Sequence, residues 1–255
     1  MNKKGVLFLL SIVMILVLAA CGEKENTNGG SKDKQVLILG TSADFPPFES
    51  YNPEGEIVGF DIDIAKLVAD ELGVELKIED MDFNGLIAAL QTNRVDMVMA
   101  GMSATEERRK NVEFSSEYHR SGEMFVTKQD SEITSLDDIS GKVVGVQLGT
   151  IQEEGAKNLQ KEIDFEVKLI DSATTLIQEL LTGRIDIAYM DQTVAEGYIQ
   201  EQNLKGFEDP TSSSPGMAIA FPKDGELVEE VSAIIDQLIE DGTIAQLEEK
   251  WGLNK

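Results

Sequence analysis

Cysteine and histidine are almost absent from this chain of 255 residues, since Cys21 and His119 are the sole members of their types. One cysteine cannot form a disulfide within the chain, so disulfides contribute nothing to its stability. A zinc site needs several Cys, His or acidic ligands placed together, and no second ligand accompanies His119 in the sequence. We therefore expect neither a bound metal nor another cofactor.

Basic residues are scarce as well. The chain has 22 Lys and Arg against 47 Asp and Glu, and its formal net charge is −25. Proteins that bind nucleic acid neutralise phosphates with a surplus of Lys and Arg, so this balance argues against a nucleic-acid partner. The acidic surplus favours a solvated surface, and its field would also mildly concentrate a cationic ligand.

Long hydrophobic segments are missing too. The longest uncharged run near the start, residues 5–20, is shorter than the roughly 20 apolar residues that a membrane helix needs. Lys3 and Lys4 precede this run and Cys21 follows it directly. A basic start followed by a short apolar run is typical of an export signal. We therefore expect residues 1–20 to be a signal peptide and the remainder to lie outside the membrane.

The end of this run, residues 18–21 (LAAC), resembles the lipobox of bacterial lipoproteins. The resemblance implies cleavage before Cys21 and lipidation of this cysteine, which would anchor the protein to the extracellular face of the cell membrane. An ordinary cleavage site beside an incidental thiol is the alternative. Residues 22–34 carry no aliphatic or aromatic side chain. We therefore expect residues 21–34 to form a lipid-anchored, flexible tether.

From residue 35 onward, short strand-like runs alternate with helical stripes. Residues 36–39 and 75–78 are predicted strands, and the spacing of Ile64, Val68 and Leu72 predicts a helix. Such alternation favours an α/β fold with mostly parallel sheets that are flanked by helices.

One sequence unit occurs twice. Residues 92–97 (TNRVDM) recur as residues 182–187 (TGRIDI), and each copy follows a Leu-rich helical segment and begins a predicted strand, residues 96–100 in the first copy. Two copies in this length indicate two similar α/β lobes with a cleft between them. Chance similarity of a helix-turn-strand unit is the alternative.

Ligands of open α/β sheets bind beyond the carboxyl ends of the strands. After the first repeated strand, Ser103 or Thr105 could cap a helix whose free amides attract an anion, and Arg108 offers the planar fork that binds a carboxylate. After the second, Asp191 could accept an ammonium group or cap the helix that follows. Together these groups complement the zwitterionic head of a free amino acid.

At these motifs the sequence resembles the family 3 solute-binding proteins of amino-acid ABC importers. The matching stretches are residues 40–49 (GTSADFPPFE), 59–64 (GFDIDI), 99–108 (MAGMSATEER), 141–150 (GKVVGVQLGT) and 188–191 (AYMD). The resemblance implies a two-lobed periplasmic-binding-protein-like fold of type II, in which each lobe is a mixed, mostly parallel sheet flanked by helices. It assigns residues 35–121 and 217–255 to lobe 1 and residues 122–216 to lobe 2, with crossings near residues 122–127 and 213–217.

The resemblance also implies roles for individual residues. Arg108 would pair with the ligand α-carboxylate, assisted by Ser103 and the backbone of residues 150–151. The Gly101 carbonyl and the Asp191 carboxylate would take the α-ammonium group. The ligand-binding residues that we expect are Ser42, Asp44, Phe45, Phe83, Ala100, Gly101, Met102, Ser103, Arg108, Gln147, Thr150, Ile151 and Asp191.

The stretches that most resemble arginine-binding lipoproteins of Gram-positive bacteria are residues 41–44, 80–84 and 146–154. A guanidinium group between Phe45 and Phe83 would gain about 0.5–2 kcal/mol of cation–π stacking. Its polar partners would be Asp44, Glu49 or Gln147. Core packing is the alternative role for the two phenylalanines.

The expected function is capture of a free L-amino acid, arginine or another basic one, between two closing lobes, with delivery to the transmembrane subunits of an ABC permease. We expect a monomer that is not an enzyme and that reaches the membrane only through its lipid anchor. Glutamine or another polar amino acid is the alternative ligand. A cyclohexadienyl dehydratase on the same fold is the alternative class, although the predicted cleft offers no evident His as a general acid. A sensor domain ranks last, because it would need a membrane span or a fused effector.

Overall fold

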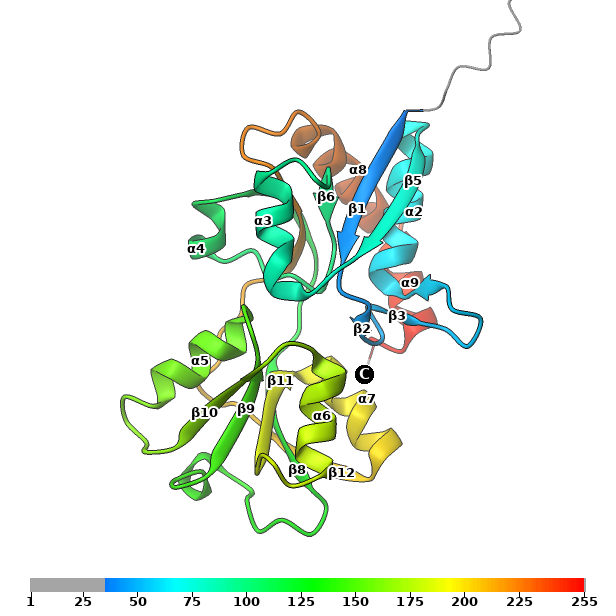
Figure 1. Cartoon of the computed structure of the whole chain (residues 1–255). Coiled ribbons are helices and arrows are strands. Elements are labelled where there is room, and N and C mark those ends of the chain that lie inside the picture. Colours follow the sequence, from blue (N-terminus) through cyan, green and yellow to red (C-terminus); the bar gives the residue numbers. More distant parts are fainter. Residues whose placement is uncertain (1–34, 255) are drawn as a thin grey trace, which may run out of the picture. The chain divides into compact units, whose positions relative to one another are not determined.

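The computed structural model describes residues 35–254. The predicted signal peptide, the lipidation site Cys21 and the tether lie outside the described residues. The described chain forms two five-stranded sheets and one three-stranded sheet, with helices around them (Figure 1). We call the part built on the first five-stranded sheet lobe 1 and the part built on the second lobe 2.

Lobe 1 contains a mixed sheet. In spatial order its strands are β5 (Glu75–Asp80), β1 (Val36–Thr41), β6 (Met97–Val98), β13 (Met217–Phe221) and β7 (Glu113–His119). Strand β1 pairs in parallel with β5 and β6, whereas β13 runs antiparallel to β6 and β7. The strand predicted over residues 96–100 is therefore correct in place but shorter. The three-stranded sheet follows β1 and consists of β2 (Asp44–Phe45), β3 (Glu49–Tyr51) and β4 (Ile57–Val58).

Lobe 2 repeats the pattern of lobe 1. In spatial order its strands are β10 (Glu166–Ile170), β9 (Val143–Gln147), β11 (Ile187–Asp191), β8 (Glu123–Lys128) and β12 (Leu204–Glu208). Strand β9 pairs in parallel with β10 and β11, whereas β8 runs antiparallel to β11 and β12. Two mixed sheets of the same design confirm the predicted fold class.

Helices flank both sheets (Figure 1). Those of lobe 1 are α2 (Phe60–Leu72), α3 (Leu86–Gln91), α4 (Glu106–Arg109), α8 (Val228–Glu240) and α9 (Thr243–Trp251), with the 3₁₀ helix η1 (Phe83–Gly85). Those of lobe 2 are α5 (Ile151–Leu159), α6 (Ala173–Leu181) and α7 (Gln192–Gln202), with the 3₁₀ helix η2 (Leu136–Asp138). Helix α2 buries Ile64 and Val68 and ends at Gly73 with a left-handed φ of 68°, as the sequence predicts.

The core lies on both faces of each sheet. In β11, Ile187 and Tyr189 pack in the cluster that contains Ala156 of α5, whereas Ala188 and Met190 pack in the cluster that contains the buried side chains of α6. Successive side chains of a strand point to opposite faces. Helices α5 and α6 therefore cover opposite faces of the second sheet.

The sequence repeat makes the same contacts in both lobes. Asp96 accepts a hydrogen bond from the backbone N–H of Ile38 in lobe 1 (2.7 Å), and Asp186 accepts one from Val143 in lobe 2 (2.8 Å). The residue before each repeated Arg has positive φ, 53° at Asn93 and 74° at Gly183. The repeat is therefore a structural duplication, as predicted, which tethers the central strand of each lobe to the neighbouring one.

Two segments connect the lobes. The first, residues 120–122, lies between β7 and β8, and the second, residues 209–216, lies between β12 and β13. The first crossing was predicted near residues 122–127, but strand β8 already begins at Glu123 and pairs with β11 and β12. Because β8 is already paired at Glu123, the first connection ends before it, at residues 120–122.

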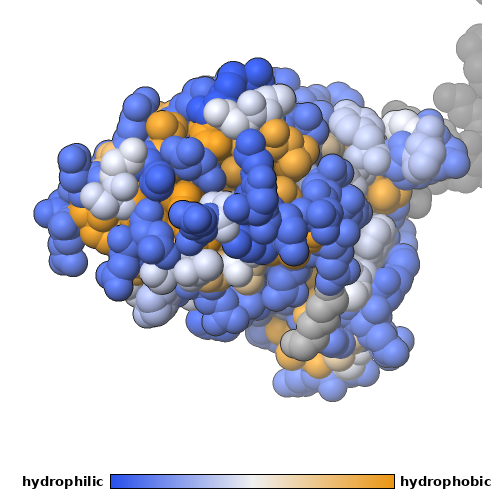
Figure 2. Space-filling view, turned by 90° about the horizontal axis from the view of Figure 1, so that it is seen from below, coloured by the Kyte–Doolittle hydropathy of each residue, from blue (hydrophilic) through white to orange (hydrophobic). Residues whose placement is uncertain are grey.

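The surface is mainly polar. On the face shown in Figure 2, hydrophilic residues predominate and hydrophobic residues are interspersed among them. Within residues 35–254, none of the helices is both long and apolar enough to cross a membrane.

Candidate functional site

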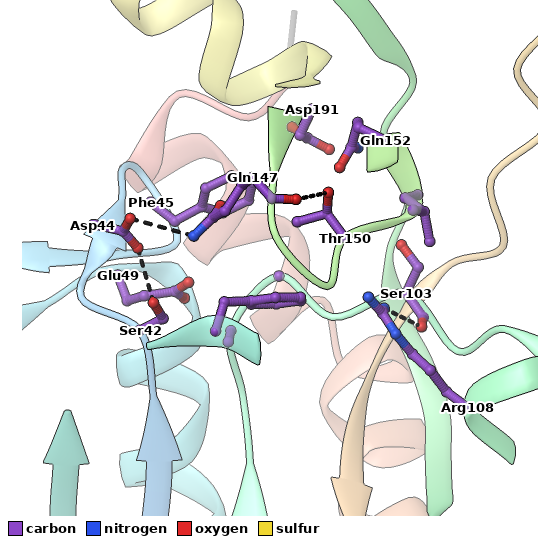
Figure 3. Close-up of a pocket in the computed structure, with 14 residues that line it drawn as sticks. Ser42, Asp44, Phe45, Glu49, Ser103, Arg108, Gln147, Thr150, Gln152 and Asp191 are labelled. Carbon is purple, nitrogen blue, oxygen red and sulfur yellow. Dashed lines mark hydrogen bonds between the residues drawn. The ribbon is translucent and has the colours of Figure 1, made fainter. Parts of the chain in front are cut away.

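A cavity lies where the two lobes meet (Figure 3). Its walls come from the carboxyl ends of β9 and β11 and from the segments that follow β1, β5, β6 and β9. The lining residues are Ser42, Asp44, Phe45, Glu49, Phe83, Ala100, Gly101, Ser103, Arg108, Gln147, Thr150, Ile151, Gln152 and Asp191. All predicted site residues except Met102 line this cavity. Met102 is buried in the lobe 1 core beside Ala100 and Phe114.

Arg108 lies in α4 and is held at the boundary between the lobes. Its guanidinium donates to the Ser103 carbonyl (2.8 Å) in lobe 1 and to the Gly149 carbonyl (3.0 Å) in lobe 2. The guanidinium carbon also lies 5.3 Å from the centre of the Phe83 ring. Burial lowers the pKa of Arg108 to about 10, so the group stays protonated at neutral pH. A guanidinium has five N–H donors, and those not used on carbonyls can bind a carboxylate.

The helix that carries Arg108 begins at the predicted cap. Sequence reasoning left Ser103 and Thr105 as candidates, and Thr105 is the N-cap residue, because its hydroxyl accepts a hydrogen bond from the Arg108 backbone N–H (3.2 Å). Ser103 instead forms an isolated bridge with Met217 of β13.

The N-terminus of α5 forms a second wall of the cavity. Thr150 is its N-cap: the hydroxyl accepts from the Glu153 backbone N–H (3.2 Å) and donates to the Gln147 carbonyl (2.7 Å). The first amides of an α-helix, here those of Ile151 and Gln152, have no partner inside the helix. Together with the helix dipole, they favour an anion at this point. Arg108 and the start of α5 therefore form an anion-binding corner.

Asp191 lies at the carboxyl end of β11 and lines the same cavity. It is the N-cap residue of α7, since one carboxyl oxygen accepts from the Val194 backbone N–H (3.2 Å). Of the two roles left open by the sequence, the N-cap role is therefore observed, and the carboxyl group also lines the cavity. Burial raises the pKa of Asp191 to about 7. A cation placed in the cavity would favour the charged form of this carboxyl group.

Gly101 brings the backbone of lobe 1 close to the ligand space. Its φ is 56°, and a Cβ atom here would lie 2.9 Å from the Phe45 ring. The Gly101 N–H donates to Asp61 Oδ2 in α2 (2.8 Å). A residue with a side chain would be strained at this position and would push into the aromatic wall. Asp61 belongs to the motif of residues 59–64, and through this bond it supports the backbone that lines the cavity.

The opposite end of the cavity is acidic. Asp44 in β2 accepts a hydrogen bond from the Ala173 backbone N–H at the start of α6 (2.5 Å), from Ser42 Oγ (3.0 Å) and from Gln147 Nε2 (3.4 Å). The bonds from Ala173 and Gln147 join lobe 1 to lobe 2, and Figure 3 shows the one from Gln147. Burial raises the pKa of Asp44, while the amide of Ala173 works against this rise.

Glu49 differs from every other acid of the cavity. Its residue is 0 % exposed, and neither carboxyl oxygen has a hydrogen-bond partner within the described chain. Burial and the nearby Asp61 carboxyl group raise its pKa well above the ordinary value. Sequence analysis named Glu49 only as a potential partner of a guanidinium group. A buried, unsatisfied carboxyl group beside a cavity is a strong acceptor for a ligand donor.

Sequence analysis missed one lining residue, Gln152. It is buried, lies in the first turn of α5, and is drawn near Asp191 in Figure 3. Its position two residues after the cap Thr150 was the available signal, because the first turn of a helix faces whatever its N-terminus binds.

The described residues contain no group of three or more His, Cys, Asp or Glu side chains that could hold a metal ion. His119 is the last residue of β7. Its Nδ1 atom lies 2.8 Å from Glu248, and its ring packs against Phe48 and Phe60. Its contacts are those of a core side chain at the end of a strand.

Two mixed α/β lobes with an anion-binding corner, a buried acid and an acidic end in the cavity between them are the design of a small-molecule binding protein. The chain belongs to the bacterial extracellular solute-binding proteins, family 3, whose model matches residues 37–254. This match confirms the resemblance drawn from the sequence motifs.

Several individual relatives within this family are named for the amino acids that they bind. The chain is 42% identical over 252 residues to the arginine-binding extracellular protein ArtP of Bacillus subtilis (strain 168), with 98% of each chain covered. It also resembles the structure of an ancestral arginine-binding protein bound to arginine, with 40% identity and a TM-score of 0.81 over 86% of this chain and 99% of the other. A structure of an ancestral arginine-binding protein bound to glutamine is similar at 40% identity and a TM-score of 0.80, over 86% and 98%. All three are named for binding, not for catalysis.

Proposed function

We propose that this chain captures a free L-amino acid, with arginine or another basic amino acid as its main ligand, and delivers it to the transmembrane subunits of an ABC permease. One observation carries the proposal: the cavity places Arg108 and the α5 N-terminus on one wall, Asp191 on another, and the acids Asp44 and Glu49 at its other end. A free basic amino acid carries charges of the complementary sign at each of these places.

The amino-acid head would bind at the corner that contains Arg108. The α-carboxylate would accept donors from Arg108, Ser103 and the amides after Thr150, because a charged guanidinium and a helix N-terminus both stabilise an anion. The α-ammonium group would donate to Asp191 and to the Gly101 carbonyl. Pairing with an ammonium group would stabilise the charged form of Asp191, which burial disfavours.

The side chain would extend between Phe45 and Phe83 toward Asp44, Glu49 and Gln147. A guanidinium group is planar and charged, so it stacks on aromatic rings and donates to carboxylates at the same time. Glu49 supports arginine most directly, since its unsatisfied carboxyl oxygens need donors.

Glutamine is the second candidate ligand. The observation that favours it is the similar ancestral protein whose structure contains glutamine. A carboxamide would find the same aromatic wall and could exchange hydrogen bonds with Gln147 and with a protonated Glu49. The proposed ranking places arginine first, because the side-chain end carries two carboxyl groups.

Calorimetric titration of the purified protein against the twenty amino acids, ornithine, citrulline and cystine tests the ligand. We expect arginine to bind most tightly, other basic amino acids next and glutamine more weakly. Failure of every free amino acid to bind would reject the proposal.

The proposal includes closure of the lobes on the ligand. Residues 35–121 and 217–255 would move as lobe 1 against residues 122–216 as lobe 2, about the two connections. A ligand that touches both lobes stabilises the closed state by its differential contacts. X-ray scattering with and without saturating arginine measures this change, and identical dimensions would contradict closure.

We further propose that residues 1–20 direct export, that Cys21 is lipidated, and that residues 21–34 tether a monomer to the extracellular face of the membrane. Mass spectrometry of the mature N-terminus would find a diacylated or triacylated Cys21. The Cys21→Ala variant should lose membrane attachment while its folded part still binds the ligand. A variant that stays attached would refute the lipid anchor.

A further inference from the structure

Glu49 and Asp61 form a buried pair of carboxyl groups behind the side-chain end of the cavity. Both residues are 0 % exposed. Asp61 Oδ2 accepts hydrogen bonds from the Gly101 N–H (2.8 Å) and the Tyr118 hydroxyl (2.8 Å). Asp61 Oδ1 and both oxygens of Glu49 have no donor within the described chain. The Asp61 backbone N–H donates to the carbonyl of Phe48, the residue before Glu49 (3.1 Å), so the two acids are neighbours in space.

Two ionised carboxylates in contact and out of water repel each other strongly, so such pairs hold a shared proton. The hydrogen bonds decide where the negative charge stays. Asp61 receives two donors from the protein, which stabilise its ionised form, whereas Glu49 receives none. A proton on Glu49 that is donated to Asp61 Oδ1 satisfies an oxygen of each group that otherwise lacks a partner.

Within the described residues, no cationic side chain bonds to Glu49 and could replace this proton. The titratable and charged groups around Glu49 are Asp61 in α2, Asp44 in β2, Asp80 in β5, Tyr118 and His119 in β7, and, across the cavity, Arg108 and Asp191. Most of these are acids, and His119 is directed to Glu248. Arg108 is engaged by two backbone carbonyls. Burial and the neighbouring acids raise the pKa of Glu49 well above its usual range. Burial raises the pKa of Asp61 to about 6, and the hydrogen bonds from Gly101 and Tyr118 work against this rise.

Building on the function proposed above, we propose that Glu49 carries a proton bonded to Asp61 in the ligand-free protein and that the guanidinium group of arginine displaces it. The protonated Glu49 carboxyl group loses its proton to solvent and becomes a carboxylate paired with the guanidinium cation. The guanidinium cation takes the place of the proton, so one positive charge still offsets the charge of the two carboxyl groups.

A neutral carboxamide has no charge to exchange and leaves the proton on Glu49. Glu49 then donates to, or accepts from, the amide of glutamine. The choice between cationic and neutral side chains therefore depends on pH. The ratio of the glutamine Kd to the arginine Kd rises about tenfold for each pH unit over the range in which Glu49 holds its proton.

Calorimetry in buffers of different ionisation enthalpy counts the protons that the full-length protein releases on binding. Asp191 contributes to the count for every amino acid, so the comparison of arginine with glutamine isolates the side-chain end. Arginine should release more protons than glutamine by up to one. Equal counts for the two ligands would overturn the proposal, and absence of any arginine binding would instead reject the function proposed above.

Infrared spectroscopy of the ligand-free protein tests the proton on Glu49 without any ligand. The Glu49→Gln variant should lose one carbonyl band of a protonated carboxyl group relative to the unaltered protein. Glu54→Gln, the same change at an exposed position in the loop after β3, should lose none. If Glu49→Gln and Glu54→Gln have the same protonated-carboxyl spectrum, Glu49 is ionised in the ligand-free state and the proposal is wrong.

Discussion

The central strands β6 and β11 begin alike and end differently. At their start, Asp96 and Asp186 make matching hydrogen bonds to the neighbouring strand. At their end, lobe 1 continues through Gly101 and Ser103 to Arg108, whereas lobe 2 ends on Asp191. The repeated starts bond each central strand to its neighbour, whereas the divergent ends bring Arg108 of lobe 1 and Asp191 of lobe 2 to the same cavity. Substitutions at the ends and at the starts of these strands test this difference.

The largest effect is expected at Arg108. Arg108→Ala removes a buried charge that we assign to the α-carboxylate, and loss of such a partner costs about 2–5 kcal/mol, or roughly 30- to 5,000-fold in Kd. Calorimetry should find this loss for every amino acid. The neighbouring Arg109, which stacks on Phe114 and does not line the cavity, is the matched control. A mere change in which side chain is preferred would contradict the assignment.

Ligand affinity at the Asp191 end of the cavity should depend on pH. Since burial raises the pKa of Asp191 to about 7, the carboxyl group is protonated below that pH and cannot pair with an ammonium group. Affinity for neutral amino acids such as glutamine should therefore rise about tenfold per pH unit below pH 7 and level off above it. Asp191→Asn keeps an N-cap residue for α7 but should weaken binding and flatten this profile. An unchanged profile in the variant would remove Asp191 from the ammonium site.

A smaller effect separates the ligands at the aromatic wall. Phe45→Leu keeps an apolar side chain but removes the ring, which should cost arginine about 0.5–2 kcal/mol of cation–π stacking. Glutamine should lose less, because its side chain carries no charge. Equal losses for the two ligands, measured by titration calorimetry, would indicate that Phe45 contributes only apolar packing.

The smallest effects are expected at the repeated starts of the two strands. Asp96→Ala and Asp186→Ala should each lower the free energy of unfolding by about 0.5–1.5 kcal/mol, because each leaves a backbone N–H without its acceptor. The loss should be larger for the less exposed Asp96. Neither change should alter ligand affinity. Denaturant unfolding with a parallel titration checks both statements, and a large loss of affinity would show that the two ends are coupled.

Much of the fold was predictable because it depends on local patterns. The helix of residues 60–72 and the two repeated units follow from apolar spacing and from short repeated motifs, whereas the mixed character of each sheet was implied by the family resemblance. The length of β6 was not, because its second half leaves the sheet to approach the cavity through Gly101, whose φ is positive. Pairing between distant strands also fixed the first crossing, since β8 is already paired at Glu123.

The site was predictable where a residue type stands at the end of a strand or helix. Arg108, Thr150 and Asp191 carry such signals. Met102 packs in the lobe 1 core instead, because a methionine in an apolar segment suits a core and a pocket wall equally well. The role of Glu49 could not be derived, because its unsatisfied state arises only when α2 brings Asp61 against β3.

The central claim is that the protein recognises both ends of a basic amino acid. Titration calorimetry with arginine, with agmatine, which lacks the carboxylate, and with glutamine, which lacks the guanidinium group, tests it directly. The account predicts tight binding of arginine, weaker binding of glutamine and no measurable binding of agmatine. Agmatine that binds as tightly as arginine would contradict it.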